Sequence, residues 1–212
     1  MMKALVGMGA ALMSAACSTV GVRTGTEEPS YQVVSRVGDL EVRRYGDRIA
    51  AQTVVSGDDG AARNRGFQRL AGYIFGGNAT RASIAMTAPV AQASAPGSEK
   101  IAMTAPVAQV PAGPDRWTIQ FFMPAEYALA DLPVPNDPTV QLVAVPGETF
   151  AVLRFSGVGS TGAIEAHKQM LMTQLAPGPW RAVAEPVVWF YDPPWTLPPL
   201  RRNEVAVRVE PR

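Results

Sequence analysis

The 212-residue sequence contains a single cysteine, Cys17, and a single histidine, His167. One cysteine excludes an internal disulfide framework and any cysteine-rich metal site. One histidine excludes bis-histidine ligation of a metal within one chain. Lysine and arginine total 19 against 18 acidic residues, so the formal charge is +1 and the chain has no large excess of positive charge for binding nucleic acid. The composition therefore argues against disulfide scaffolds, zinc modules and nucleic-acid-binding proteins.

Sequence signatures of catalysis are also missing. The chain has no paired carboxylates at helical spacing, no nucleophile elbow, no glycine-rich phosphate loop and no zinc-ligand spacing. The Gly-Gly-Asn run at 76–78 is typical of a helix end and not of a phosphate cradle. Because 47% of the residues are hydrophobic, the chain can bury a substantial core. We therefore expect a binding protein and no enzymatic activity.

The first 16 residues are typical of an export signal. Lys3 gives a positive start, residues 4–13 form an apolar run, and small residues precede Cys17. This order resembles a bacterial lipoprotein signal, in which the cysteine is lipid-modified and begins the mature chain. We expect an outer-membrane lipoprotein facing the periplasm, attached to the membrane through Cys17. The alternative is ordinary secretion after cleavage behind Ala16, which gives a periplasmic or secreted protein.

The remaining residues divide into a tether and one domain. Residues 17–30 are small and polar, which predicts a lipid anchor followed by a flexible tether. Residues 31–37 and 40–45 flank Gly38-Asp39 and predict a β-hairpin, with a further strand over 49–55. A periodic apolar stripe then predicts a helix that is capped by Asp58 or Asp59 and ends at Gly76-Gly77.

The second half of residues 31–212 follows a similar order. Residues 140–145 and 149–155 flank Pro146-Gly147 and predict a second hairpin. The next helix is expected to start at Ser160 or Thr161 and to bury the stripe Ile164, Lys168, Leu171, Met172 and Leu175. After the helix of the first half a strand is predicted over 117–123, and after the helix of the second half strands are predicted over 187–191 and 204–209. The prediction is an α+β fold built from two pseudo-repeated halves, each a hairpin, a helix and two strands.

A nonapeptide, IAMTAPVAQ, occurs twice, at 84–92 and at 101–109. If each copy is a strand, alternation places Met86 and Met103 on the inward face. The proline of each copy cannot donate to a ladder, which predicts an edge strand or a bulge. We interpret the repeat as a duplicated piece of scaffold and not as a binding site.

Several stretches together resemble the SOUL haem-binding protein family: YQVVSRVGDLEVRRY, YIFGGN, IAMTAPV, FFMPAEY and FYDPPWTLPPLRRNEV. They run from Tyr31 to about Val209, in order. The resemblance implies a distorted antiparallel β-barrel with two helices, which binds haem or free porphyrin non-covalently. The same architecture resembles bacterial effector-binding domains, so a groove for another apolar small molecule is an alternative. An enzyme acting on tetrapyrroles is a third possibility, of which the sequence gives no direct sign.

The resemblance also implies which residues contact the porphyrin. The first helix is the one expected to face it, with the apolar wall Phe67, Leu70, Ala71 and Ile74. Arg63, one turn earlier, borders this stripe and is a candidate partner for a propionate. The alternative is that the stripe is core and that Arg63 extends to water.

Other candidates lie in the second half and in the repeat. Tyr191 and Trp195, in the proline-rich run, are candidates for stacking on a porphyrin edge; otherwise their loop packs against the barrel. His167, Met86 and Met103 are candidate axial ligands of haem iron. The competing interpretation makes His167 an edge histidine and both methionines core residues.

Overall fold

The computed structural model describes residues 26–79, 97–193 and 195–212. Cys17, Met86, the first copy of the nonapeptide and the predicted signal segment lie outside these residues. In the described ranges, no helix has both the length and the apolar composition needed to cross a membrane.

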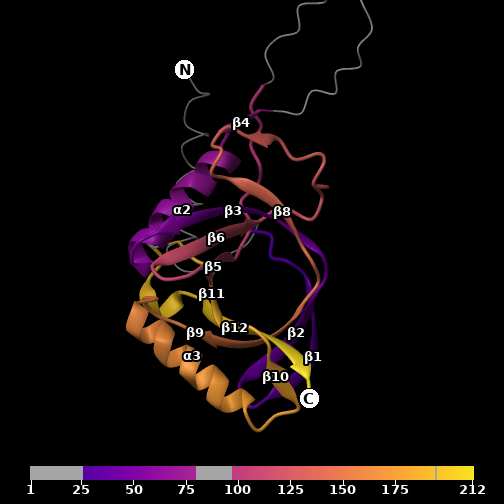
Figure 1. Ribbon diagram of the computed structural model, residues 1–212, viewed down its shortest axis with the longest axis vertical. Coiled ribbons are helices and arrows are strands. Elements are labelled where there is room, and N and C mark those ends of the chain that lie inside the picture. The colour runs from indigo at the N-terminus through magenta and orange to yellow at the C-terminus, as the bar shows by residue number, and fades with distance from the viewer. Residues whose placement is uncertain (1–25, 80–96, 194) are drawn as a thin grey trace, which may run out of the picture.

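One large antiparallel sheet forms the body of the domain. Its order is β1-β2-β9-β12-β11-β5-β6-β3-β8, and β10 pairs with β12. The sheet curves strongly around an inner face, with α2 and α3 on the outside (Figure 1). The predicted α+β class, a distorted barrel with two helices, is confirmed. The strands are β1 Tyr31–Val37, β2 Leu40–Tyr45, β3 Arg48–Ser56, β5 Val107–Pro111, β6 Arg116–Phe122, β8 Gln141–Val145, β9 Thr149–Phe155, β10 Trp180–Ala182, β11 Val187–Phe190 and β12 Asn203–Pro211.

Three short elements complete the fold. Strands β4 (Asn78–Ala79) and β7 (Val134–Pro135) pair in a separate small sheet. A 3-10 helix, η1, spans Pro198–Leu200 in the proline-rich run before β12.

The first predicted hairpin is confirmed and the second is wrong. β1 and β2 pair around Gly38-Asp39, where Val37 faces Leu40. Strands β8 and β9 do not pair with each other: β8 pairs with β3, while β9 pairs with β2 and β12. The pseudo-repeated halves thus exchange strands.

Two hydrogen bonds join the chain after β2 to the chain before β9 and fix this exchange of strands. Tyr45 N donates to the Glu148 carbonyl at 2.9 Å, and Gly147 N donates to Asp47 Oδ1 at 2.7 Å. A Cβ at position 147 would lie 2.9 Å from the Tyr45 carbonyl, so this close approach requires glycine. The turn signal at Pro146-Gly147 therefore marks a corner, because β8 pairs with β3 and β9 pairs with β2 and not with each other.

Helix α2 (Asp59–Ile74) covers β3 and β6 on the outer face. Asp58 caps it by accepting a hydrogen bond from Ala61 N, and Gly76 adopts a positive φ of 113° just beyond its end, as predicted. A Cβ on Gly66 would lie 2.3 Å from Ile119 Cγ1, so the helix approaches the sheet at its glycine. Leu70 is fully buried in the resulting core.

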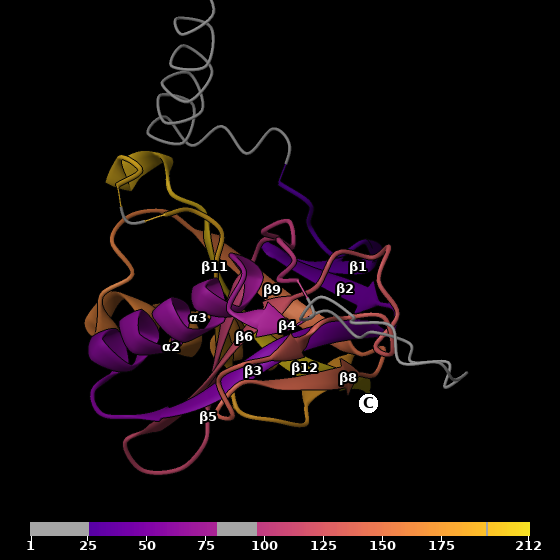
Figure 2. The same cartoon turned by 90° about the horizontal axis from the view of Figure 1, so that it is seen from above.

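Helix α3 (Thr161–Leu175) covers β9 and β12, also on the outside (Figures 1 and 2). Ser160 caps it through a bond from Ala163 N. Of the predicted stripe, Ile164, Leu171 and Leu175 are buried. Met172 is 40% exposed, which makes the buried face narrower than predicted.

The second copy of the nonapeptide is only partly a strand. Residues 101–106 are irregular, and β5 begins at Val107. Met103 is therefore 38% exposed, and the prediction that it points inward is wrong. The predicted edge strand or bulge is also wrong for this copy, since β5 lies between β11 and β6 and pairs with both in regular register. Pro106 precedes the ladder, where no donor is needed.

Candidate functional site: a groove on the inner face

The inner face of the sheet contains a groove of about 380 Å³ that is open to solvent. Its volume lies within the range of roughly 300 to 1,000 Å³ that is usual for small-molecule pockets. Strands from both halves contribute to its walls. The lining residues are Arg48, Ala108, Val110, Pro111, Gln120, Phe122, Val145, Glu148, Phe150, Ala184, Glu185, Val187, Trp189 and Arg208.

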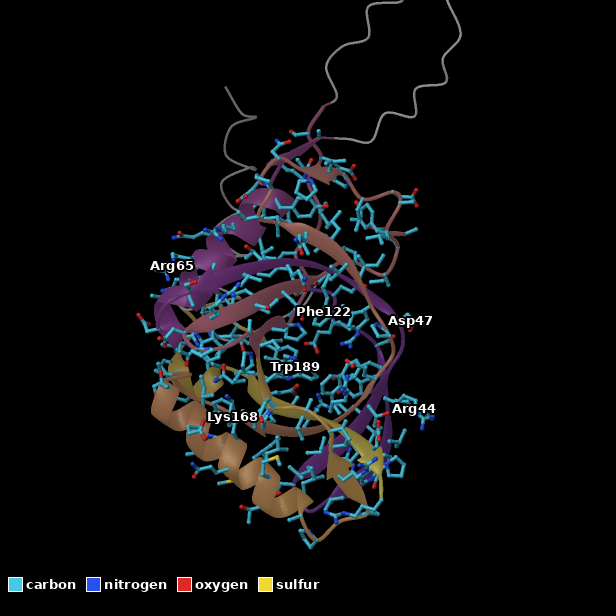
Figure 3. The ribbon with its side chains drawn as sticks, in the orientation of Figure 1. Arg44, Asp47, Arg65, Phe122, Lys168 and Trp189 are labelled. Atoms are coloured by element: carbon cyan, nitrogen blue, oxygen red, sulfur yellow. The ribbon has the colours of Figure 1, made fainter. Side chains whose placement is uncertain are left out.

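Strand alternation explains why these side chains gather on the inside. On β6, Gln120 and Phe122 line the groove, whereas Ile119 and Phe121 pack in the core under α2. On β11, Trp189 lines the groove while Val188 joins the core under α3. Figure 3 shows Phe122 and Trp189 on the inner side of the curved sheet.

Three aromatic rings make the apolar floor rigid. Trp189 lies 5.2 Å from Phe150 and 5.6 Å from Tyr45, measured between ring centroids, in tilted or edge-on geometry. Tyr45 and Phe150 complete the triangle at 6.0 Å. Of the three, Phe150 and Trp189 line the groove, and rings fixed in this way lose little side-chain entropy when a ligand binds.

Arg48 is the cation of the inner face that has no acidic partner. Its guanidinium carbon lies 4.7 Å from the ring centroids of both Tyr45 and Phe122. Within the described residues its Nε is buried without a hydrogen-bond partner, and no carboxylate lies within ion-pair distance. Burial lowers the pKa of Arg48, with partial compensation from the charge of Tyr45 and Glu148. An anionic ligand group would satisfy this cation.

The rim of the groove carries a paired charge. Arg208 Nη1 donates to Glu148 Oε1 at 2.9 Å, and both side chains are partly exposed. Glu185 lies exposed on the same groove. The rim therefore carries one ion pair and one further carboxylate, that of Glu185, whereas the interior carries the positive charge of Arg48.

A buried charge cluster lies beside the groove, around Glu204. This fully buried carboxylate accepts hydrogen bonds from Arg43 at 2.9 and 3.2 Å and from Tyr191 Oη at 2.7 Å. Arg202 pairs with Glu204 at 2.9 Å and bridges to Glu28 at 3.0 Å. The cluster ties β2, β12 and the segment before β1 together, and its charges are already matched.

The cluster also shifts the pKa values of the groups in it and beside it. Burial lowers the pKa of Arg43, but the Glu204 charge and its hydrogen bonds outweigh this and hold that pKa above its usual value. Burial raises the pKa of Tyr45 to about 12, although the Arg43 charge opposes the shift. These groups keep one charge state through the neutral range, which favours a structural role.

The predicted wall on α2 is largely incorporated into the core. Leu70 and Ile74 are 0% and 1% exposed, and Phe67 and Ala71 pack against the same core while remaining half-buried. Phe67 contacts Phe121 edge-on at 5.3 Å.

Arg63, the predicted propionate partner, contacts protein groups. Its guanidinium lies 4.4 Å from the Phe190 ring centroid, and Nη1 donates to the Gly159 carbonyl at 3.3 Å. The α2 candidates thus share one helix, but much of their surface is used in packing.

The remaining candidates lie in separate places. Tyr191 is 7% exposed and bonded to Glu204, whereas Trp195 is 62% exposed in the proline-rich run. His167 stacks on Phe155 at 4.1 Å, and its Nδ1 contacts the Ala163 carbonyl of its own helix. The described candidates Arg63, Tyr191, Trp195, His167 and Met103 do not line the inner groove.

Sequence reasoning missed the residues that form the groove, above all Arg48, Phe122, Phe150 and Trp189. A signal was present, since Phe122 and Trp189 alternate with core residues on recognisable strands. It was not decisive, because alternation divides a strand into two faces without saying which one a helix will cover.

Solved structures of low identity share this architecture. The C-terminal domain of EcmrR aligns with a TM-score of 0.57 at 10% identity, covering 86% of this chain and 99% of that domain. A structure described as a hydrolase from Listeria innocua aligns with a TM-score of 0.54 at 15% identity, covering 84% and 94%. At such identities the likeness concerns the fold alone.

Sequence comparison is more specific. Heme-binding protein 2 of Mus musculus is 29% identical over 151 residues, which cover 66% of this chain and 68% of the mouse protein. The family described as SOUL heme-binding protein matches residues 26–208, which span the three described ranges almost completely. The chain therefore belongs to the SOUL heme-binding protein family.

Proposed function

We propose that this domain binds haem or a related tetrapyrrole non-covalently, as a carrier or to sequester it, without transforming it. The observation that supports this best is the family match over residues 26–208. The match covers both halves of the fold, and hence every wall of the inner groove. Similarity to a mouse protein named for haem binding agrees with the same ligand class.

The inner groove suits the organic part of a tetrapyrrole better than its metal. Phe122, Phe150 and Trp189 offer aromatic surface, and the guanidinium of Arg48, which has no acidic partner among the described residues, suits a propionate. The lining residues include no histidine, cysteine, methionine or tyrosine, which are the usual axial ligands of haem iron. A bound haem would supply redox and ligand-binding chemistry, while the chain would supply stacking surface and one cation.

We also propose that the protein acts in the cell envelope, attached through a lipid on Cys17. The support is the order of a positive residue, an apolar run and small residues before the cysteine. Labelling with a palmitate analogue in a bacterial host tests it. The wild-type chain should be labelled, and a Cys17→Ala chain should be unlabelled and released from membranes; equal labelling of both would exclude this anchor.

Titration with haemin and with iron-free protoporphyrin IX tests the binding function. We expect saturable one-to-one binding of both, followed by absorbance and by quenching of tryptophan fluorescence. Absence of saturation with either compound would refute tetrapyrrole binding. In that case the alternative of a groove for another apolar small molecule gains support, since the groove itself does not depend on a tetrapyrrole.

Incubation of the haem complex with a reductant and oxygen tests for catalysis. A carrier keeps the intensity of the Soret band, apart from the shift that reduction of the iron itself causes. Steady loss of the Soret band with release of a product would instead identify an enzyme acting on tetrapyrroles.

A further inference from the structure

The inner groove and the outer surface of α2 are two separate places for a ligand in this fold. They differ in how much of their surface is already used in packing. On α2, Leu70 and Ile74 are buried in the core and cannot contact a ligand, while the groove retains an open volume of about 380 Å³ beside Phe122 and Trp189.

The two places also differ in their cation. Arg63 on α2 has a carbonyl partner, that of Gly159, and lies over Phe190. Arg48 in the groove lies between two aromatic rings, and its buried Nε lacks a partner among the described residues. A buried, unsatisfied donor on a cation is costly unless a ligand completes it.

Charge pairing singles out Arg48 among the inner-face arginines. Arg43 and Arg202 pair with Glu204, and Arg208 pairs with Glu148. A ligand carboxylate entering the groove therefore meets one cation that has no competing acid in direct contact. Stacking over Tyr45 and Phe122 holds its guanidinium plane in position.

From these contrasts we infer that the tetrapyrrole binds in the inner groove, with a carboxylate paired to Arg48 and the ring against Phe122, Phe150 and Trp189. This assignment rests on the proposed function. It makes the carboxylate, and not the iron, the group that is recognised, because the lining residues offer no usual axial ligand. The open side of the groove lets the rest of a large ring project toward solvent.

The test compares protoporphyrin IX with its uncharged dimethyl ester in four full-length chains. These are the wild type, Arg48→Gln, Arg63→Gln and the control Arg44→Gln, which removes an exposed arginine from β2, the strand that precedes β3 in the chain. Circular dichroism and thermal melting establish that each chain is folded. Fluorescence quenching gives each dissociation constant.

We expect the wild type to prefer the free acid by about tenfold or more, as a charge-assisted pair provides. Arg48→Gln should lose that preference, while Arg63→Gln and Arg44→Gln keep it. Haemin should follow the free acid in every chain. A Trp189→Phe chain should bind both the free acid and the ester more weakly, because a smaller ring remains against the porphyrin, whereas Trp195→Phe should bind both as the wild type does.

Other outcomes distinguish an error in the proposed binding site from an error in the proposed function. If Arg63→Gln loses the preference for the free acid and Arg48→Gln keeps it, the ligand lies on α2 and the assignment to the groove is wrong. Tetrapyrrole binding itself would still stand. Unchanged affinity in Trp189→Phe would likewise overturn the assignment to the groove. If Arg48→Gln does not fold, two other chains test the site. Arg48→Lys, which keeps the charge, should retain the preference for the free acid, and Trp189→Phe should bind both compounds more weakly. No binding by the wild type refutes the proposed function itself.

Discussion

The outer and inner faces of the curved sheet come from the same strands but differ in chemistry. The outer face presents Ile119 and Phe121 to α2, and Val205 and Val207 to the core under α3. The inner face carries aromatic rings and arginines and stays partly open. A helix removes water from the face it covers, so only apolar side chains are stable there without partners. The uncovered face can keep charge, which makes it the better place for an anionic ligand.

The largest expected effect comes from the charge cluster of the inner face. Replacing Glu204 by glutamine leaves the buried Arg43 and the part-buried Arg202 without their shared counter-charge. We expect a loss of about 3 to 5 kcal/mol in the free energy of unfolding, measured with urea. Glu210→Gln is the control, since its exposed pair with Arg181 is worth under about 1 kcal/mol. Equal losses would mean that the buried cluster does not stabilise the inner face.

A second prediction concerns the outer face. Leu70→Ala removes a fully buried side chain under α2 and should cost about 2 to 5 kcal/mol of unfolding free energy. Porphyrin affinity of the folded protein should change little, because this side chain faces away from the groove. A large loss of affinity at unchanged stability would contradict the separation of the two faces.

The third prediction is a pH dependence on the inner face. The pKa of Tyr45 is about 12 in the folded chain, above the value of about 10 of an unfolded chain. The stability from keeping this phenol neutral is complete below pH 10 and is lost as pH rises through 10 toward 12. The loss is roughly 2 to 3 kcal/mol. Urea unfolding at several pH values should show it for the wild type relative to Tyr45→Phe, and parallel curves would refute it.

The smallest predicted effect tests the start of α2. Asp58→Ala removes the side chain that accepts from Ala61 N. The expected cost is about 1 kcal/mol, by the same unfolding measurement. Asp58→Asn, which keeps the cap, should recover most of it. A loss as large as that of Leu70→Ala would show that Asp58 has a further role.

Local signals in the sequence predicted the elements well. Asp58 and Ser160 cap helices as expected, and the Gly38-Asp39 turn closes its hairpin. These features depend on neighbours within a few residues, so the sequence contains the physical cause. Met103 shows the limit, because its exposure follows from where β5 begins.

Strand partners and the candidate site depended on distant contacts. Pro146-Gly147 looks like a hairpin turn, but β8 and β9 pair with strands about a hundred residues away. The same exchange brings together, around one groove, Arg48 on β3, Glu148 in the corner before β9 and Trp189 on β11. No spacing within the chain could predict that meeting.

By itself, the sequence determined the α+β class, the two capped helices and the family, because apolar periodicity, capping residues and family motifs are local patterns. Only the tertiary structure decided which face of each strand the helices cover and which arginine is left without an acid. Those outcomes depend on how β3 and β9 pair across the two halves, and on the burial that follows when the helices pack onto one side.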